Sequence, residues 1–306
     1  MTTATVTQTP PKGFTWTEGF DQSRQHLNHR PFRLSHSLAN HPLFSLDRLI
    51  QQARLAHKRP GDLYFDSGDV RIDQKWGQIP ISDLSYEDVL SRIEHSRAWL
   101  IMKHIECDPD YAAVLDACTR TVLELAPEPL RSQISKPEML IIVSSPNRIT
   151  PFHIDGELNF LVQVRGSKTA RVFDRDNRTV LTEEEIERFY TIDGVAANFK
   201  PDIGPHAQVF ELAPGDAIHI PVNAPHWVMN GTEPSVSLSI NYELPESVRA
   251  NIYRAKFVLR KLGFSPNPPG ESPLRDAAKS ALVSSTYLPA RALGKRLKRL
   301  LRKPVN

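Results

Sequence analysis

Cysteine is scarce in this sequence. Cys107 and Cys118 are the only two among 306 residues, and neither belongs to a Cys-x-x-Cys pair. A disulfide framework would need more cysteines than this, so we expect both thiols to be reduced and to serve as small core residues. A disulfide between the two is the alternative. Reduced thiols are typical of a cytoplasmic protein.

Long apolar runs are also missing. No stretch approaches the roughly 18 apolar residues that a membrane span requires. Residues 1–13 are rich in threonine and proline and lack the apolar segment of a secretory signal. Because 40% of the residues are hydrophobic and 24% are charged, the composition predicts a globular protein with a sizeable core.

Positive charge is concentrated near the end of the chain. The net charge is +3, yet residues 291–303 carry seven basic residues and no acidic one. Subtracting these seven from 38 basic residues leaves 31, against 35 acidic residues in the whole chain. Leucines recur at helical spacing in this tail, which suits a helix on an anionic membrane surface, a helix that binds nucleic acid or an acidic partner, or a helix packed on the body. The absence of tryptophan and phenylalanine from the tail weakens the membrane interpretation.

In the first half of the chain, the spacing of apolar residues predicts mostly helices and one strand. We expect residues 1–44 to form an irregular arm and residues 45–245 to form the main domain. Within that domain, the apolar spacing and capping residues predict helices at 45–58, 85–97 and 109–125, and a strand at 98–105.

From residue 139 the pattern changes to short apolar segments separated by proline, glycine and asparagine. Such spacing is typical of a sandwich or barrel, and we place the β core at about 139–243. Seven strands are expected: 139–143, 159–164, 168–173, 208–212, 217–221, 226–230 and 236–242. A helix at 181–190, capped by Thr182, interrupts them. Residues 246–306 form a C-terminal helical segment that includes the basic tail. The predicted fold class is therefore mainly β with helical flanks.

One histidine and one aspartate lie two residues apart in this β region. His153 and Asp155 would share one face of an extended chain, where an imidazole and a carboxylate can bind one divalent metal ion. His226, at the start of a later predicted strand, can supply a third ligand. Two histidines and one carboxylate leave adjacent metal positions open, which suits Fe(II).

A predicted hairpin lies between these ligands. Gly166 and Ser167 fit a two-residue turn, which would pair Arg165 with Lys168 and Leu161 with Val172. One strand face would then carry Asn159, Leu161, Gln163, Lys168, Ala170 and Val172. If this face lines the barrel, Lys168 is a buried charge that needs an anion.

The last predicted strand divides its residues between an apolar and a polar face. Val236, Leu238, Ile240 and Tyr242 fall on one side, whereas the polar side holds Ser235, Ser237, Ser239 and Asn241. A strand of this kind resembles the wall of a solvated pocket.

Together these motifs resemble a known family. The sequence is similar to the JmjC or cupin-like Fe(II)- and 2-oxoglutarate-dependent oxygenases, nearest to the branch of the factor-inhibiting asparaginyl hydroxylase, over about residues 139–243. The residues that carry the resemblance are Thr150-Pro-Phe-His-Ile-Asp155, Asn159-Phe160, Gly166-Ser-Lys168, Pro214-Gly-Asp216, Ile220-Pro221, His226 and Asn241. Pro225 departs from the pattern, because the hydroxylase has an aromatic residue there.

The resemblance implies a double-stranded β-helix, of the jelly-roll or cupin type, and a role for each motif residue. His153, Asp155 and His226 would be the iron ligands and the catalytic centre. Lys168 and Thr150 would bind the distal carboxylate of 2-oxoglutarate, and Asn159 and Asn241 would lie beside its metal-binding end. His219 and His206 do not match a ligand position.

The implied activity is that of a dioxygenase. It would use O2 and 2-oxoglutarate to hydroxylate an unidentified protein, lipid or small-molecule substrate, or to demethylate it by hydroxylation, releasing succinate and CO2. The alternative is a catalytically inactive, metal-binding cupin-like protein with a regulatory or binding role. In this family, helices after the barrel, here 246–262, also suggest a homodimer.

Overall fold

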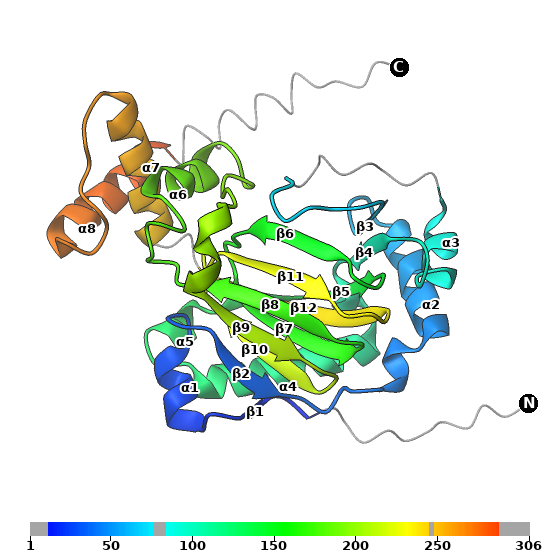
Figure 1. Ribbon diagram of the computed structural model, residues 1–306. Helices are drawn as coiled ribbons and strands as arrows, with labels where there is room; N and C mark the ends of the chain where they lie inside the picture. Colours follow the sequence, from blue (N-terminus) through cyan, green and yellow to red (C-terminus); the bar gives the residue numbers. More distant parts are fainter. Residues whose placement is uncertain (1–11, 76–83, 245–247, 288–306) are drawn as a thin grey trace, which may run out of the picture. The chain divides into compact units, whose positions relative to one another are not determined.

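The computed structural model describes residues 12–75, 84–244 and 248–287 (Figure 1). These residues fall into two compact units, one within 1–180 and 198–244 and the other within 181–197 and 245–306. The division into an arm, a main domain and a C-terminal segment stays a prediction. The basic tail, 291–303, lies outside the described residues. Of the helices described, none has the length and apolar character needed to cross a membrane.

The first unit contains all the described strands, in two antiparallel sheets. The larger sheet has the order β1-β2-β10-β7-β12-β5-β4-β3, and the smaller one has the order β6-β11-β8-β9. The strands of the larger sheet are β1 (Thr15–Trp16), β2 (Phe32–Ser35), β3 (Leu63–Ser67), β4 (Ala98–Met102), β5 (Ser135–Ser144), β7 (Leu158–Arg165), β10 (Asp216–Ile220) and β12 (Ser235–Glu243). Those of the smaller sheet are β6 (Ile149–His153), β8 (Lys168–Phe173), β9 (Ala207–Leu212) and β11 (His226–Asn230). The two sheets form the double-stranded β-helix (Figure 1).

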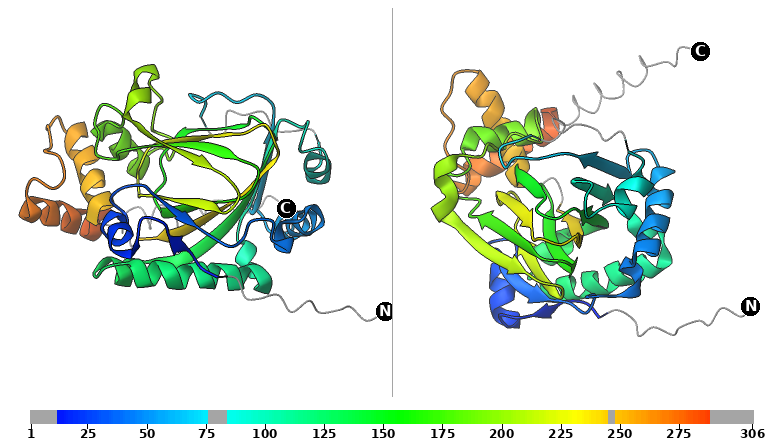
Figure 2. Two further views of the ribbon diagram at one scale, coloured as in Figure 1. Left: turned by 60° about the horizontal axis from the view of Figure 1, so that its bottom comes forward. Right: turned by 45° about the vertical axis from the view of Figure 1, so that its right-hand side comes forward.

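Helices cover the outer face of the larger sheet. They are α1 (Phe20–His26), α2 (Leu46–His57), α3 (Tyr86–Ser91), α4 (Pro109–Leu125) and α5 (Leu130–Gln133), with short helical turns at Pro42–Phe44 and Ile105–Cys107. A further turn, Pro201–His206, leads into β9 of the smaller sheet. The longest, α4, lies along this sheet (Figure 2). Its apolar face joins one hydrophobic core with the alternate strand residues Val162, Leu238 and Tyr242. The expected apolar face of β12 is thus confirmed.

The facing surfaces of the two sheets enclose a second, smaller apolar cluster. It draws on both sheets, and its members are Leu161, Ala170, Val172, Phe210, Leu212, Ile218, Ile220, Ala224 and Val228. Because side chains alternate along a strand, the neighbours of these residues point outward. The strand face with Leu161, Ala170 and Val172 thus lines the barrel, which is the condition under which Lys168 was expected to be buried.

The turn at Gly166 and Ser167 connects β7 to β8, but these strands do not pair. β7 pairs with β10 and β12, whereas β8 pairs with β9 and β11, so the predicted pairing of Arg165 with Lys168 is wrong. The turn instead carries the chain from the larger sheet to the smaller one. Glycine is required there because φ is +70° and a Cβ atom would lie 2.5 Å from the carbonyl oxygen of Pro234.

Several elements differ from their predicted form. The arm expected to be irregular contains β1, α1 and β2, and β2 pairs with β10 in the larger sheet. Helix α3 ends at Ser91, six residues before the predicted end, after Ser85 has capped its first turn through a bond from the Asp88 amide at 3.1 Å. Both cysteines are free, but Cys107 is exposed and only Cys118 is buried.

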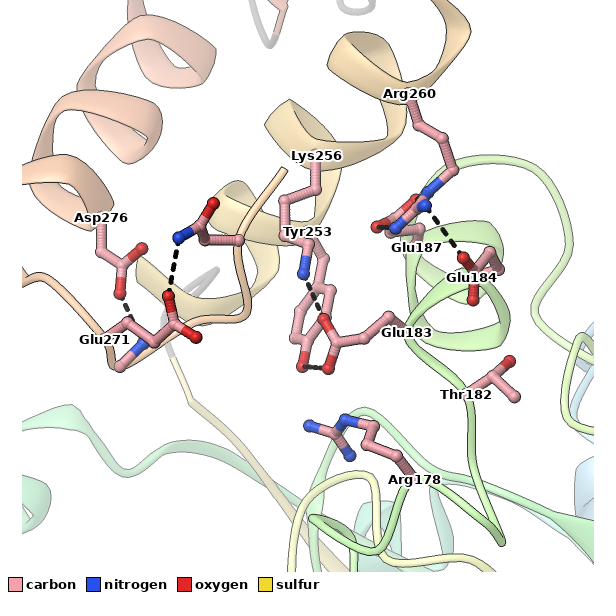
Figure 3. Close-up of polar contacts among 12 residues, drawn as sticks. Arg178, Thr182, Glu183, Glu184, Glu187, Tyr253, Lys256, Arg260, Glu271 and Asp276 are labelled. Atoms are coloured by element: carbon pink, nitrogen blue, oxygen red, sulfur yellow. Dashed lines mark hydrogen bonds and ion pairs between the residues drawn. The ribbon is translucent and has the colours of Figure 1, made fainter. Parts of the chain in front are cut away.

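The second unit combines the inserted helix with the C-terminal helices. Its elements are α6 (Glu183–Thr191), α7 (Val248–Lys261), α8 (Pro273–Leu282) and a π-helical turn at Val283–Tyr287. As predicted, Thr182 caps α6, here in a capping box with Glu185. Ion pairs join α6 to α7: the buried Lys256 bonds Glu183, and Arg260 bonds Glu187 at 2.9 Å (Figure 3).

Candidate metal centre

Three potential metal ligands meet at one end of the barrel. His153 ends β6 and His226 begins β11, and the two residues are direct partners in the antiparallel ladder. Their ring centroids are 4.1 Å apart. Asp155 follows in the loop after β6, and one ligand atom from each of the three residues lies within 4.8 Å of the others. Among the residues that the structure describes, no other group of histidine, cysteine and acidic side chains gathers in this way.

The backbone orients both imidazoles. Nδ1 of His153 lies 2.7 Å from the carbonyl oxygen of Pro151, and Nδ1 of His226 lies 2.9 Å from that of Ala224. A carbonyl only accepts hydrogen bonds, so each Nδ1 carries the proton and each Nε2 keeps its lone pair. The two Nε2 atoms lie 3.8 and 3.6 Å from the carboxylate oxygens of Asp155. Both lone pairs are therefore available to a metal on the side of the carboxylate.

Electrostatics also favour the neutral imidazole that a metal requires. Burial and the neighbouring His153 lower the pKa of His226 to about 4, so its ring is neutral at pH 7. Glu157, half-buried two residues beyond Asp155, has its pKa raised by burial and by the charge of Asp155.

One residue of this site was not found from the sequence. Asn223 is fully buried, and its amide and side-chain Nδ2 donate hydrogen bonds to the carbonyl oxygen of Asp155 at 2.8 and 3.1 Å. Its φ of +61° is one that asparagine tolerates better than most residues. Asn223 therefore fixes the loop before His226 against the loop that carries Asp155. The available signal was an asparagine between Pro221 and Pro225.

Lys168 lies on the inner surface of the smaller sheet. It begins β8, alternates with Ala170 of the inner apolar cluster, and is 3% exposed. No hydrogen bond or ion pair joins its ammonium group to any residue that the structure describes. Burial lowers the pKa of Lys168 to about 7. Lys168 is thus a buried amine for which the described chain supplies no anion, and its predicted anionic partner stays a prediction.

Thr150 lies on the same inner surface. It pairs with Val228 of β11, and directly paired residues share a face, so Thr150 faces the interior with Val228. On the other side of β11, Ala170 of β8 pairs with the same valine. Lys168 lies two residues before Ala170 and therefore on the same face of β8. Thr150 and Lys168 thus flank β11 from neighbouring strands. The hydroxyl of Thr150 has no hydrogen-bond partner in the described part of the chain.

Asn159 and Asn241 are joined to each other. They are direct partners in the ladder between β7 and β12, and Nδ2 of Asn159 donates to Oδ1 of Asn241 at 2.5 Å. Ser239 joins both, accepting from Asn159 at 2.6 Å and donating to Asn241 at 3.1 Å. The structure places these two amides on the inner face of the larger sheet, the sheet opposite Lys168.

The polar face of β12 is only partly a pocket wall. Ser235 and Ser237 are fully buried and bond the side chain of Gln163 at 3.0 and 2.7 Å. Gln163 also donates to the carbonyl of Gly166 at 3.0 Å. These groups satisfy one another and close one end of the barrel, so the expectation of a solvated wall is wrong for Ser235 and Ser237.

The two other histidines considered lie apart from the ligand group. His219 is fully buried; it packs on Phe32 and Phe160, donates from Nδ1 to the carbonyl of Asn159 at 3.0 Å, and accepts at Nε2 from the amide of Asn28 at 2.9 Å. Burial lowers its pKa to about 3, so it is a neutral structural residue. His206 is exposed at the end of a helical turn.

The sequence and the fold were compared with those of known proteins. No family model matches the sequence. No curated protein matches it either. Similar structures exist for YcfD of Escherichia coli, which is described as a ribosomal oxygenase. One of them matches with a TM-score of 0.53 and 18% identity over 95% of this chain and 70% of that one. The fold shared with YcfD is the double-stranded β-helix described above. A second YcfD structure, with cobalt and 2-oxoglutarate bound, matches with a TM-score of 0.52 and 17% identity over 95% of this chain and 69% of that one.

At this level of identity the likeness establishes the fold alone. The two matched structures are of a ribosomal oxygenase rather than an asparaginyl hydroxylase. The family, its nearest branch and the roles of the individual residues therefore stay predictions.

Proposed function

We propose that the protein is an Fe(II)- and 2-oxoglutarate-dependent oxygenase. The observation that carries the proposal is the joint presence of two features inside one barrel. One is the His153, Asp155 and His226 group, with both Nε2 atoms turned toward the carboxylate. The other is Lys168, a buried cation with no anionic partner in the described chain. A bound metal ion alone would explain the ligand group but not Lys168. A metal ion together with a dicarboxylate cosubstrate would explain both.

The residues present fit these two groups. Two neutral imidazoles and one carboxylate form a donor set that binds Fe(II) and leaves adjacent positions open. Bound Fe(II) would supply the activation of O2 that oxidises the substrate and converts 2-oxoglutarate to succinate and CO2. Cobalt and 2-oxoglutarate bound in a protein of the same fold support this assignment.

The chain's own residues would bind and orient the cosubstrate. The ammonium of Lys168 would pair with the distal carboxylate, and the hydroxyl of Thr150 would donate a hydrogen bond to it. The paired amides of Asn159 and Asn241 would lie beside the other end. Apolar side chains of the barrel interior exclude water around these groups, which strengthens each polar contact.

A protein is the substrate class to test first. YcfD is described as a ribosomal oxygenase, and this supports a ribosomal protein as a candidate substrate. Mass spectrometry of cells that carry His153→Ala, compared with the parent strain, should reveal the substrate as a protein that loses a modification of +16 Da. The same comparison of small molecules and lipids covers the other substrate classes. A molecule that is 14 Da lighter in the parent strain than in the variant strain would indicate demethylation.

The alternative is a cupin-like protein that binds a metal without catalysis. The two functions differ in turnover of 2-oxoglutarate. Purified protein with Fe(II), ascorbate and 2-oxoglutarate should form succinate slowly without substrate, and Asp155→Ala should remove this activity. Asp116→Ala is the matched control, because Asp116 is an exposed aspartate on α4 and does not belong to the ligand group. Metal binding without succinate formation, and without an absorption band from anaerobic addition of 2-oxoglutarate, would favour the alternative.

A further inference from the structure

Exposed apolar side chains are concentrated in the second unit. Five large ones in the described chain are more than half exposed, and all belong to this unit: Ile192, Leu262, Phe264, Leu274 and Leu282. Leu274 and Leu282, which are 86% and 59% exposed, lie at the two ends of α8. Apolar residues exposed together on one surface indicate a binding surface more often than single ones do. α8 therefore carries a candidate surface of this kind.

Helix α8 turns its polar side toward the rest of the unit. Asp276 and Val283 are buried and Lys279 is partly buried, which places these three residues on one face. The carboxylate of Asp276 accepts the amide of Gly270 at 2.7 Å and lies 3.6 Å from Nζ of Lys279 (Figure 3). The opposite face is exposed and apolar, and its residues are Leu274, Ala277, Ala278, Ala281 and Leu282. An amphipathic helix normally buries its apolar face, so this face of α8 is available to a partner.

A segment with a matching pattern follows α8 closely in the chain. The π-helical turn after α8 ends at Tyr287, and the basic tail begins at residue 291. Leu293, Leu297, Leu300 and Leu301 of the tail have the same spacing as Leu274, Ala278, Ala281 and Leu282 of α8. Each set would span about 12 Å of helix. Pro289 lies between the two segments and cannot continue a helix, so the sequence predicts a short connection there.

The tail is the occupant that these patterns favour. We propose that residues 291–303 form a helix that folds back on α8 as an antiparallel hairpin and covers its apolar face. Helices joined by so short a connection are antiparallel neighbours. The leucines would pack against the alanines, whose small size lets the two helices approach closely. The basic residues would lie at the sides and on the outer face, in solvent. This inference does not depend on the oxygenase activity.

Two other occupants fit this face less well. α8 has ten residues, so its exposed face is about 15 Å long and about 10 Å wide. This area is far below the roughly 800 Å² that each partner buries in a stable dimer, so a second copy held by α8 alone would bind weakly. A membrane surface favours large apolar and aromatic side chains, whereas three of the five residues on this face are alanine. The tail needs no large area, because the short connection holds it at a high local concentration.

Limited proteolysis of the full chain with trypsin tests the proposal, because the tail is rich in lysine and arginine. A docked helix opens only transiently, so cleavage within 291–303 should be at least about tenfold slower than in Ala278→Glu, which places a charge in the apolar contact. Leu297→Glu, on the tail itself, should speed up cleavage in the same way. Ala113→Glu is the matched control and should change nothing, because Ala113 is an exposed alanine of α4. Thermal melting checks that the variants fold.

Three results would overturn the proposal. One is equal cleavage of the tail in the unmodified protein and in Ala278→Glu. The second is protection that grows with protein concentration, together with a dimer in light scattering, which would assign the face to a second copy. The third is protection that appears only with vesicles that contain phosphatidylglycerol, which would assign the face to a membrane surface.

Discussion

Replacing Lys168 with methionine should stabilise the ligand-free protein and abolish binding of 2-oxoglutarate. Methionine has a similar length and no charge, so it removes the buried ammonium while filling the same space. Burial lowers the pKa of Lys168 from 10.5 to about 7, which corresponds to about 5 kcal/mol against the charged form. Most of this free energy opposes folding at pH 7, because the unfolded chain holds the proton that the folded chain tends to lose.

The sign of the pH dependence follows from the same shift. The pKa of Lys168 is lower in the folded protein than in the unfolded chain, so between pH 7 and 10.5 the unfolded state binds more protons and stability rises with pH. The methionine variant has no titratable group at this position, so it lacks this rise of stability with pH. Its advantage over the unmodified protein should therefore shrink by about 2 kcal/mol between pH 7 and pH 9.

Urea denaturation at pH 7 and pH 9, without and with 2-oxoglutarate, measures both the difference in stability between the two proteins and the binding of 2-oxoglutarate. The unmodified protein should be stabilised by 2-oxoglutarate in the presence of a metal, and Lys168→Met should not be. A variant that is less stable than the unmodified protein at pH 7, yet is still stabilised by 2-oxoglutarate, would refute both the buried charge and its assigned anion.

Three further predictions concern the same barrel. The affinity for 2-oxoglutarate should fall about tenfold from pH 6 to pH 8 as Lys168 loses its proton, and Lys168→Arg, which stays charged, should show no such fall in calorimetry. Asp155→Ala should weaken Co(II) binding at least about a hundredfold by spectroscopic titration, whereas Glu157→Ala should change it by less than about fivefold; equal losses would contradict the ligand assignment. Gly166→Ala should cost about 3 kcal/mol or more in unfolding free energy, because of its positive φ and the Pro234 carbonyl, and Gly194→Ala, with open space around it, should cost under about 1 kcal/mol.

Local patterns in the sequence predicted which way side chains point but not which strands pair. The alternation around Gly166 placed Lys168 and Leu161 on the barrel interior because the period of a strand is a property of the local chain. The partner of each strand depends on residues far away in sequence. A two-residue turn favours a hairpin, yet here tertiary packing sends β7 and β8 into different sheets.

Other features were missed for related reasons. Strands β1 and β2 are two and four residues long, so their periodicity is too short to recognise, and their place in the sheet depends on pairing with β10. The support of Asp155 by Asn223 is a contact across 68 residues made by a buried loop. The ligand group itself was predictable because its residue types and spacing are set by metal chemistry.

The position of β12 has a consequence for synthesis of the chain. The last strand of the barrel occupies the middle of the larger sheet, between β7 and β5. Until residue 243 has been synthesised, the two earlier strands present opposed unpaired edges, and Gln163 has no serine hydroxyls to bond. The barrel therefore cannot close progressively from its N-terminus. A chain interrupted before β12 exposes two long apolar edges to other nascent chains, which makes protection from aggregation most important late in synthesis.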